Sequence, residues 1–491
     1  MIRILLFILL LLSSFSLLHA QNYTPRNMGP AINSPDNTDA YPAISPDGRF
    51  FFHSRDGSAT KGNYDIFYSE LLPDGTWSES VPVDELNNAE KNTVYYIYPD
   101  GNTILIEGIY GKEPSINGVS RSTRTATGWS IPEPLEFEGS PEWGNHSVSL
   151  SLDGTKMLMS LGQDLHVSFL KENGTWSNPQ KIPDNINTSN MEYTPFLAND
   201  DKTMYYSSQR PDSYGLNDIY KTTRLDDTWL KWSEPENLGS RINSTSWESF
   251  FSIGAKGDYA YVYKLDIGNG DIMQIELEKK NKPQSVVLVK GKVYNAKTNE
   301  PIAAAIHYEI LPEGSDAGTV NTSPKEGAYN IILPYGKQYG YHARAEGFLG
   351  VNENMDLSEI NDYKEITQDL YLIPIEVGQS MKLNNVFFVQ GKPEMLKSSY
   401  PELDRLAKIL QDNPTIVIEL SGHTDNQGSA DLNMQLSVSR VKAVKDYLVS
   451  KGVKEDRILG KGYGGTKPVA SNDSEQTRKL NRRVEFTILK K

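Results

Sequence analysis

Short segments in which apolar and polar residues alternate fill the first 280 residues, and this period of two predicts strands rather than helices. A recurring turn motif separates the segments, in the copies Ile44-Ser-Pro-Asp-Gly-Arg49, Ile97-Tyr-Pro-Asp-Gly-Asn102 and Leu150-Ser-Leu-Asp-Gly-Thr155. Residues 197–202 and 253–258 are weaker copies, and successive copies begin 53, 53, 47 and 56 residues apart. The sequence therefore predicts a repeated unit of about 50 residues.

Each unit predicts a small antiparallel sheet, because Asp-Gly supplies a tight turn in which glycine takes a positive φ. One such sheet cannot bury both of its faces, whereas five or six arranged radially bury them and leave few edges. Residues 25–34 repeat residues 235–244, the tail of a unit. We expect them to add a strand to the last sheet and close the ring. The prediction is an all-β propeller over residues 21–280, with five blades favoured over six.

The Ser-Pro-Asp-Gly turns and the strands that follow them resemble the WD40-like propeller repeats of the TolB family. Asp47, Asp100 and Asp153 of the turn motif form a possible acidic set, and we interpret them as turn-forming residues because aspartate caps its own turn. The region contains no Gly-x-Ser-x-Gly elbow, His-Glu-x-x-His motif or phosphate loop. We also expect no metal site, since no ligand spacing is recognisable. Propellers carry either hydrolases or binding surfaces, so this fold leaves the function open.

Residues 286–373 predict a small β-sandwich, because short alternating strands are separated by regular turn signals. Its motifs are Gly291-Lys-Val-Tyr294, Thr298-Asn-Glu-Pro-Ile302 and Leu333-Pro-Tyr-Gly336. In this order they resemble the carboxypeptidase regulatory-like, or transthyretin-like, domain. That resemblance implies a non-catalytic spacer or interaction surface.

From residue 381 to 491 the pattern changes to strands that alternate with helices, which predicts an α/β sandwich. Strands are expected at 386–388, 415–420, 457–464 and 484–489, and helices at 398–410 and 430–450, with a further short helix before the last strand. This segment carries 19 Lys and Arg against 13 Asp and Glu, a net charge of +6. The rest of the chain carries 30 Lys and Arg against 50 Asp and Glu, a net charge of −20. A basic segment on an acidic chain predicts an anionic partner for the C-terminal end.

The C-terminal segment closely resembles the OmpA C-terminal, peptidoglycan-binding family over about 105 residues. The matching stretches include Gly422-His-Thr-Asp-Asn-Gln-Gly428, Asn433-x-x-Leu-Ser437, Gly462-Tyr-Gly464 and Asn481-Arg-Arg-Val-Glu485. The resemblance implies that peptidoglycan is bound through its diaminopimelate stem peptide. It assigns the ligand contact to Asp425 and Arg440, with Thr424, Asn433 and Arg483 as supporting residues.

The residue types suit that ligand, because the diaminopimelate side chain ends in an ammonium and a carboxylate on one carbon. A carboxylate is needed for the first group, and an arginine fork holds the second with two parallel hydrogen bonds. Asn433 lies seven residues before Arg440, on the same face of the predicted helix.

Spacing alone leaves a structural interpretation open for these residues. Asp425 would then complement a helix N-terminus, and Arg440 would pair with Asp425 as a structural ion pair. We interpret Arg482 as part of a surface cluster. His423 has no serine, cysteine or carboxylate residue at a spacing typical of a catalytic pair, and we interpret it as structural.

The N-terminus has the layout of a secretory signal peptide over residues 1–20: a positive start, an apolar run from Ile4 to Leu12, and the small residue Ala20 before the expected cleavage site. A membrane anchor is the alternative, although the run is short for a spanning helix. The chain has no cysteine, which excludes disulfides, a cysteine nucleophile and a lipid-modified N-terminal cysteine.

These observations predict a non-enzymatic protein of the periplasm, associated with the outer membrane and the cell wall without a spanning segment. Its expected partners are peptidoglycan and an envelope protein bound by the propeller, as in an envelope scaffold or a secretion-machinery component. No cofactor and no nucleic acid are expected. The alternatives are a cell-wall or peptide hydrolase that uses the propeller as a substrate filter, and a propeller that senses a small ligand.

Overall fold

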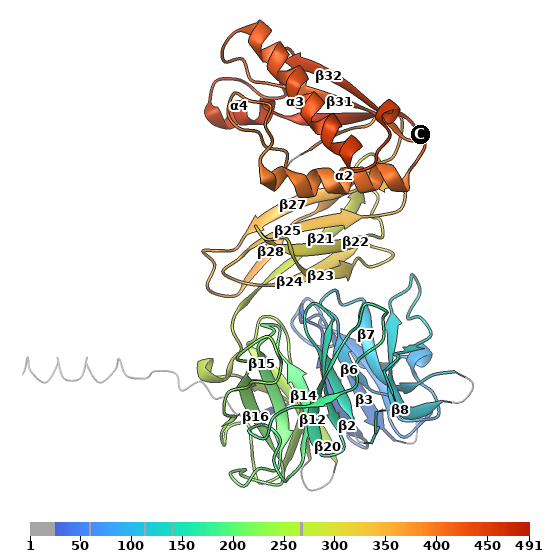
Figure 1. Cartoon of the computed structure of the whole chain (residues 1–491). Helices are drawn as coiled ribbons and strands as arrows, with labels where there is room; N and C mark the ends of the chain where they lie inside the picture. The colour runs from blue at the N-terminus through green and yellow to red at the C-terminus, as the bar shows by residue number, and fades with distance from the viewer. Residues whose placement is uncertain are drawn as a thin grey trace, which may run out of the picture. The chain divides into compact units, whose positions relative to one another are not determined.

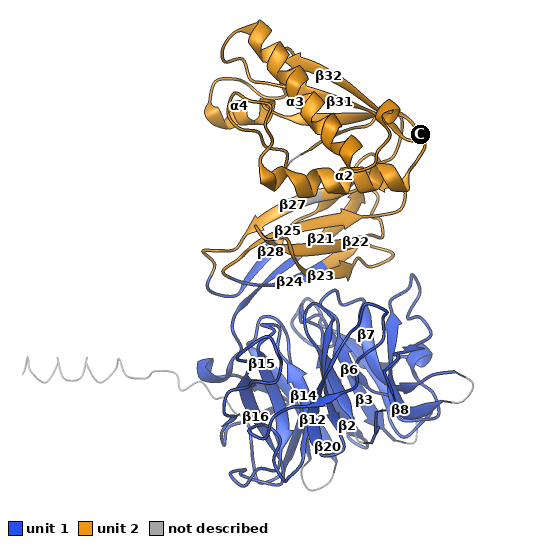
Figure 2. Ribbon diagram, in the orientation of Figure 1, with its two compact units in different colours: residues 1–289, 330–335, 361–366 blue, residues 290–329, 336–360, 367–491 orange. Residues whose placement is uncertain are grey.

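The computed structural model describes residues 25–57, 60–111, 114–139, 141–144, 146–265, 269–383 and 385–491. The predicted signal peptide at residues 1–20 lies outside these ranges. The chain forms two compact units (Figure 2). The first comprises the chain up to Val289 together with Asn330–Tyr335 and Asn361–Ile366, and the second comprises Lys290–Tyr329, Gly336–Ile360 and Thr367–Lys491. Within the described ranges, no helix is long and apolar enough to cross a membrane.

Five four-stranded antiparallel sheets make up most of the first unit (Figure 1). The first two sheets are β2 (Thr38–Ile44), β3 (Phe50–Asp56), β4 (Asp65–Glu70) and β5 (Val81–Pro82), then β6 (Val94–Ile97), β7 (Thr103–Ile109), β8 (Ser115–Thr123) and β9 (Glu133–Pro134). The next two are β10 (Ser147–Leu150), β11 (Lys156–Leu161), β12 (Asp164–Phe169) and β13 (Gln180–Lys181), then β14 (Glu192–Leu197), β15 (Thr203–Ser208), β16 (Asp218–Thr223) and β17 (Glu236–Asn237).

The fifth sheet joins the two ends of this region. It contains β18 (Trp247–Ile253), β19 (Tyr259–Leu265) and β20 (Gly270–Glu276), and its fourth strand is β1 (Arg26–Asn27). Arg26 lies opposite Gln274, and Asn27 lies opposite Met273. The segment that repeats residues 235–244 therefore supplies a strand to the last sheet, as the repeat predicted.

The strands at one edge of each of the five sheets contact one another in cyclic order. β2 contacts β6, β6 contacts β10, β10 contacts β14, β14 contacts β18, and β18 contacts β2. Neighbouring sheets also share apolar clusters. Phe52 of the first sheet packs with Ile104 of the second, and Phe51 of the first packs with Tyr261 and Ile272 of the fifth. Each sheet thus buries apolar side chains against its neighbours, which no single sheet achieves alone.

A buried asparagine after the fourth strand recurs in four of the five sheets. The amide of Asn187 accepts a hydrogen bond from Leu165 N (2.7 Å) and donates to Leu165 O (2.9 Å), so it completes the edge of β12 where β13 has ended. The same exchange joins Asn33 to Ile272, Asn87 to Ile66 and Asn243 to Ile219. Two of these asparagines stand in the segments that repeat each other, in Ile32-Asn-Ser34 and Ile242-Asn-Ser244.

The aspartates of the turn motif hold their own turns, which confirms the interpretation made from the sequence. Asp100 Oδ1 accepts a hydrogen bond from Asn102 N (2.8 Å), and Asp153 Oδ1 accepts one from Thr155 N (3.0 Å). The fourth copy departs from the pattern, because Asp201 stands where the other copies have glycine and takes a φ of 58°. Burial of the carboxyl, with the neighbouring charge of Asp153, raises the pKa of Asp201 to about 6.

The strands between residues 286 and 374 form two further sheets. One has the order β24-β21-β29-β26, with β28 paired to β21, and the other has the order β23-β22-β25-β27. Their bounds are β21 (Val286–Asn295), β22 (Ala305–Leu311), β23 (Ser315–Asn321), β24 (Ala328–Pro334), β25 (Gln338–Arg344), β26 (Phe348–Leu349), β27 (Val351–Asp356), β28 (Lys364–Thr367) and β29 (Leu370–Pro374).

The C-terminal domain is a four-stranded sheet with helices. Its sheet has the order β30-β33-β31-β32, in which β31 and β32 are parallel. Its elements are β30 (Ser380–Lys382), η3 (Lys397–Ser399), α2 (Tyr400–Asp412), β31 (Val417–His423), α3 (Ala430–Ser450), η4 (Glu455–Arg457), β32 (Ile458–Gly464), α4 (Glu475–Asn481) and β33 (Val484–Lys490).

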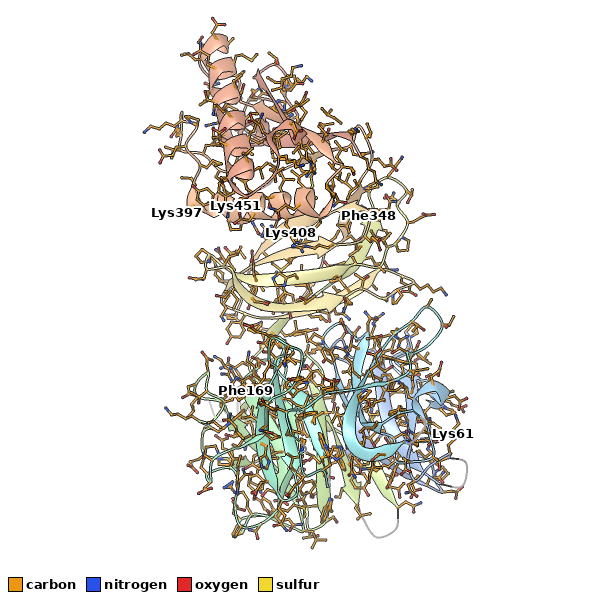
Figure 3. All side chains as sticks on the ribbon, turned by 45° about the vertical axis from the view of Figure 1, so that its right-hand side comes forward. Lys61, Phe169, Phe348, Lys397, Lys408 and Lys451 are labelled. Carbon is orange, nitrogen blue, oxygen red and sulfur yellow. The ribbon has the colours of Figure 1, made fainter. Side chains whose placement is uncertain are left out.

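The two long helices of this domain are joined at their surface. Tyr400 stacks on Tyr447, and Lys451, labelled in Figure 3, pairs with Asp404. Leu406, Val444 and Ile418 belong to the apolar core that these helices and the sheet enclose. The α/β pattern expected from the sequence is therefore present, with both long helices within two residues of their expected bounds.

The strand expected at 386–388 is wrong. Phe388 makes only an isolated bridge with Met395, and the edge strand of the sheet is β30 instead, paired with β33. The apolar run at 386–388 gave the stronger strand signal, whereas β30 is short and only half-buried, as edge strands often are.

We expect Asn187→Ala to destabilise the first unit by about 2 kcal/mol, because the backbone N–H and C=O of Leu165 then lose their partner inside the protein. Urea unfolding followed by fluorescence measures this loss. Asn190→Ala is the control, since the hydrogen bond found for Asn190 among the described residues is made by its backbone N–H, to Thr188 Oγ1. Equal stability of the two variants would show that the asparagine does not stabilise the edge.

We expect Asp201→Asn to stabilise the first unit at pH 7.5, by about 3 kcal/mol at most. The carboxyl has a higher pKa in the folded chain than the ordinary value of 3.8. Its ionisation therefore costs stability that grows from about pH 4 to about pH 6, stays constant at higher pH, and vanishes where both states are protonated. Asparagine keeps the acceptor for Leu152 N and tolerates a positive φ. Thermal unfolding should show the gain at pH 7.5 and its decline towards pH 4; a gain that does not change with pH would contradict this assignment.

Candidate functional site

A stripe of glycines brings helix α3 against strand β32. A Cβ built on Gly462 would lie 2.5 Å from Ser437 Oγ and 2.6 Å from Val438 N, and Gly460 and Gly464 also face the helix at short distance. Ser437 Oγ accepts a hydrogen bond from Gly464 N (2.9 Å). Backbone and helix can touch only where there is no side chain, and this contact fixes α3 beside the loop that follows β31.

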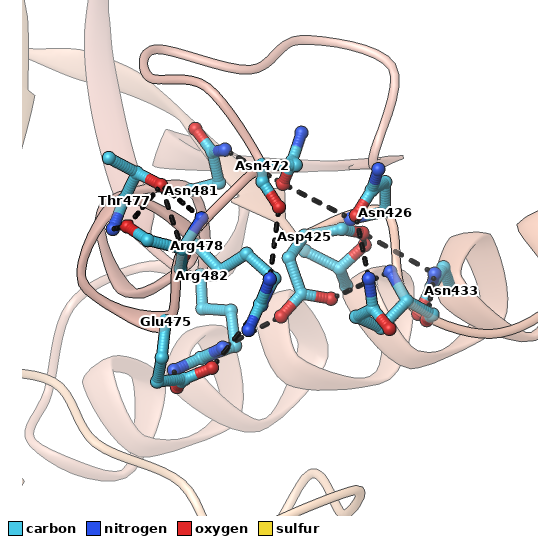
Figure 4. Close-up of polar contacts among 12 residues, drawn as sticks. Asp425, Asn426, Asn433, Asn472, Glu475, Thr477, Arg478, Asn481 and Arg482 are labelled. Atoms are coloured by element: carbon cyan, nitrogen blue, oxygen red, sulfur yellow. Dashed lines mark hydrogen bonds and ion pairs between the residues drawn. The ribbon is translucent and has the colours of Figure 1, made fainter.

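Asp425 lies in that loop, and its carboxylate is buried. Its Oδ1 accepts a hydrogen bond from Gln427 N (3.1 Å), and its Oδ2 accepts one from Arg482 Nη1 (2.7 Å; Figure 4). Helix α3 starts at Ala430, so the hydrogen bonds found for this carboxylate within the described residues lie in the loop and at Arg482, and none goes to an α3 amide.

Thr424 and Asn433 shape the same loop through its backbone carbonyls. Thr424 Oγ1 donates to Asp425 O (2.9 Å), and Thr424 N donates to Gly464 O (2.9 Å). Asn433 Nδ2, on the first turn of α3, donates to Gln427 O (2.9 Å). Both residues thus position Asp425, and neither bonds its carboxylate.

Arg440 lies on α3 with its guanidinium 4.8 Å from the ring centre of Phe388. Its Nε donates to Lys392 O (3.2 Å), and within the described ranges this is its one hydrogen bond. Burial lowers the pKa of Arg440, the positive charge of Arg482 lowers it further, and the charge of Asp425 opposes both. Asp425 and Arg440 are therefore close enough to interact electrostatically, while the terminal nitrogens of Arg440 keep their hydrogen-bonding capacity.

Arg482 is exposed at the surface, as interpreted from the sequence, and it also bonds the buried Asp425. It joins Asp425 to Glu475, a residue at the start of α4, through its two terminal nitrogens (Figure 4). The contact with Glu475, supported by that with Asp425, raises the pKa of Arg482. Arg478 also pairs with Glu475 (3.3 Å) and donates to Asn472 O (3.0 Å). The ion pair that the sequence suggested between Asp425 and Arg440 is thus made by Arg482 instead.

Arg483 is directed to other partners. It donates from Nε to Glu485 Oε2 (3.0 Å) and from Nη1 to Lys467 O (3.2 Å). His423 lies in the same group, with Nε2 3.2 Å from Glu485 Oε1 and its ring stacked on Tyr463. Val484 is buried in the core between them, so strand alternation turns Arg483 and Glu485 to the other face of the sheet.

The site holds a buried carboxylate and, within electrostatic reach of it, an arginine whose terminal nitrogens make no hydrogen bond among the described residues. This pair suits a small ligand that carries an ammonium and a carboxylate together. Within the described residues, no group of three or more His, Asp or Glu side chains is placed to hold a metal ion.

Residues 387–482 match the model of the OmpA family. Over 103 residues the chain is 40% identical to the peptidoglycan-binding protein ArfA of Mycobacterium tuberculosis, covering 21% of this chain and 32% of that protein. The C-terminal domain is OmpA-like. The resemblance expected from the sequence is confirmed for this domain, although the family model covers only about a fifth of the chain.

Two further curated relatives match the chain over a similar length. The probable lipoprotein YiaD of Escherichia coli is 35% identical over 105 residues, which cover 21% of this chain and 48% of that protein. The outer membrane porin F of Pseudomonas fluorescens is 38% identical over 104 residues, which cover 21% of this chain and 32% of that protein. The chain thus spans a third to a half of the length of the curated relatives it matches.

Among solved structures, the peptidoglycan-associated lipoprotein from Burkholderia pseudomallei is 27% identical to this chain. The match covers 21% of this chain and 87% of that one, with a TM-score of 0.20.

We expect Gly462→Ala to destabilise the C-terminal domain by about 2 kcal/mol, because the added methyl group overlaps Ser437 and the backbone of Val438. Thermal unfolding of the full-length chain measures the change. Lys461→Ala is the control, since Lys461 is the exposed neighbour whose ammonium lies over Tyr463. A Gly462→Ala chain as stable as the control would contradict the close packing of α3.

Proposed function

We propose that this protein binds peptidoglycan non-covalently through its OmpA-like domain and performs no catalysis. The observation that carries the proposal is the pairing of a buried carboxylate, Asp425, with Arg440, whose terminal nitrogens face no partner in the described part of the domain. A site built from one acid and one arginine suits a small zwitterion, because each of the two side chains pairs with one of the ligand's opposite charges.

The ligand that fits is the side-chain end of diaminopimelate in the stem peptide. Its carboxylate takes the two terminal nitrogens of Arg440 in a bidentate contact. Its ammonium is held by Asp425. Thr424 and Asn433 position the loop, while Arg483 supports the sheet through Glu485 rather than contacting ligand.

The named relatives support a place in the cell envelope. One is called a peptidoglycan-binding protein, one a probable lipoprotein and one an outer membrane porin. Together with the signal peptide proposed at residues 1–20, this favours a periplasmic protein that is associated with the outer membrane and the cell wall.

We infer that the five sheets form a five-bladed, WD40-like propeller over residues 21–280. The cyclic contacts of the edge strands and the apolar clusters between neighbouring sheets support this inference. We further propose a carboxypeptidase regulatory-like sandwich at 286–373 and the peptidoglycan-binding domain at 381–491. The propeller then presents a surface for an envelope protein partner, as in a scaffold or secretion-machinery component.

We expect Asp425→Ala and Arg440→Ala each to weaken binding to diaminopimelate-type peptidoglycan about tenfold or more, because each removes one partner of a charge-assisted contact. Co-sedimentation of the full-length chain with insoluble sacculi measures this. Sacculi of the lysine type keep the ammonium but lack the adjacent carboxylate, so the wild-type chain should bind them weakly.

Lys442→Ala and Asp446→Ala are the matched controls, since these residues form an exposed ion pair on the same helix. Both should sediment like the wild type. Retained binding by both Asp425→Ala and Arg440→Ala would overturn the site assignment, and turnover of glycan or peptide by the intact chain would overturn the non-enzymatic proposal.

A further inference from the structure

Arg482 occupies the carboxylate that the proposed ligand needs. The Asp425 side chain is 11% exposed, and Arg482 Nη1 lies 2.7 Å from its Oδ2. A buried carboxylate without a partner is costly, and Arg482 supplies the compensating charge. An ammonium that binds Asp425 must therefore compete with Arg482 or share the carboxylate with it.

Sharing is disfavoured by the charges around the carboxylate. Arg440 and Arg482 already repel each other across it, which is one cause of the lowered pKa of Arg440. An added ammonium would be the third cation around one carboxylate. If Arg482 leaves, the site keeps one negative charge on Asp425 and one positive charge on Arg440, and the incoming zwitterion adds no net charge.

Glu475 provides a place for the released guanidinium. It contacts the other terminal nitrogen of Arg482, and its side chain is 68% exposed, whereas that of Arg482 is 34% exposed. Arg482 can therefore leave Asp425 and keep both an ion pair and contact with water. The same pair lowers the pKa of Glu475, so this carboxylate stays charged.

We propose that Arg482 is the resident counter-ion of Asp425 and that the ammonium of the ligand displaces it towards Glu475. This inference rests on the proposed function. The exchange makes Arg482 a specificity-determining residue. It lowers the affinity for zwitterions, and because it neutralises Asp425, a ligand that carries only a carboxylate can bind Arg440 without repulsion.

Calorimetric titration of the full-length chain with meso-diaminopimelate and with pimelate, which lacks both amino groups, tests this exchange. In Arg482→Gln, the affinity for diaminopimelate should rise about fivefold, equivalent to ~1 kcal/mol, the order of a partly exposed ion pair. The affinity for pimelate should fall, because an uncompensated Asp425 repels it. The ratio of the two affinities is a readout that general destabilisation does not raise.

Three further variants separate the exchange from structural effects. Arg482→Lys keeps a charge beside Asp425 and should leave the ratio near the wild-type value. Glu475→Gln removes the second partner of Arg482 and should lower the affinity for diaminopimelate. Arg478→Gln removes a contact with Glu475 that does not involve Asp425, and it should leave the ratio unchanged.

An Arg482→Gln chain that binds both ligands more weakly, or with an unchanged ratio, would overturn the exchange while leaving the proposed function intact. A wild-type chain that binds neither diaminopimelate nor sacculi would instead remove the proposed function, and the exchange with it.

Discussion

Compensation of one buried carboxylate organises the OmpA-like domain around its candidate site. Asp425 lies below the surface between two arginines, and a carboxylate in that position needs a cation close by at all times. Arg482 meets this need from the segment between α4 and β33, and Arg440 adds its charge from α3. A loop, the helix that follows it and a distant segment near the C-terminus therefore converge on one charge.

The geometry that permits this convergence comes from residues without side chains. Gly460, Gly462 and Gly464 let α3 lie directly on the backbone of β32, and the loop carrying Asp425 is then held between Gly464 and Asn433. Charge and packing thus support each other, because the close approach of the helix brings Arg440 to the loop, and the ion pairs join the loop to the segment around α4.

In the first unit, the same small sheet is repeated five times, and the repeated contacts bury its faces and complete its edges. Each small sheet has two faces to bury and edges to satisfy. Neighbouring sheets share apolar clusters, and in four of the five sheets an asparagine such as Asn187 or Asn243 completes a strand edge with its side-chain amide. Repetition also makes departures visible, and Asp201 is one, since a carboxylate takes the place of a turn glycine there.

The sequence by itself determined the elements whose signal is local. Turn chemistry and periodicity depend on neighbouring residues. The sequence therefore predicted the Asp-Gly turns, the repeat of residues 235–244 near the N-terminus, the helix at 430–450 and the motif around Asp425. Only the tertiary structure decided which strand forms the sheet edge and which arginine faces Asp425. Arg482 and Arg483 are adjacent in the sequence and chemically identical, and their partners differ because successive residues around the start of a strand point in different directions, so that one reaches Asp425 and the other reaches Glu485.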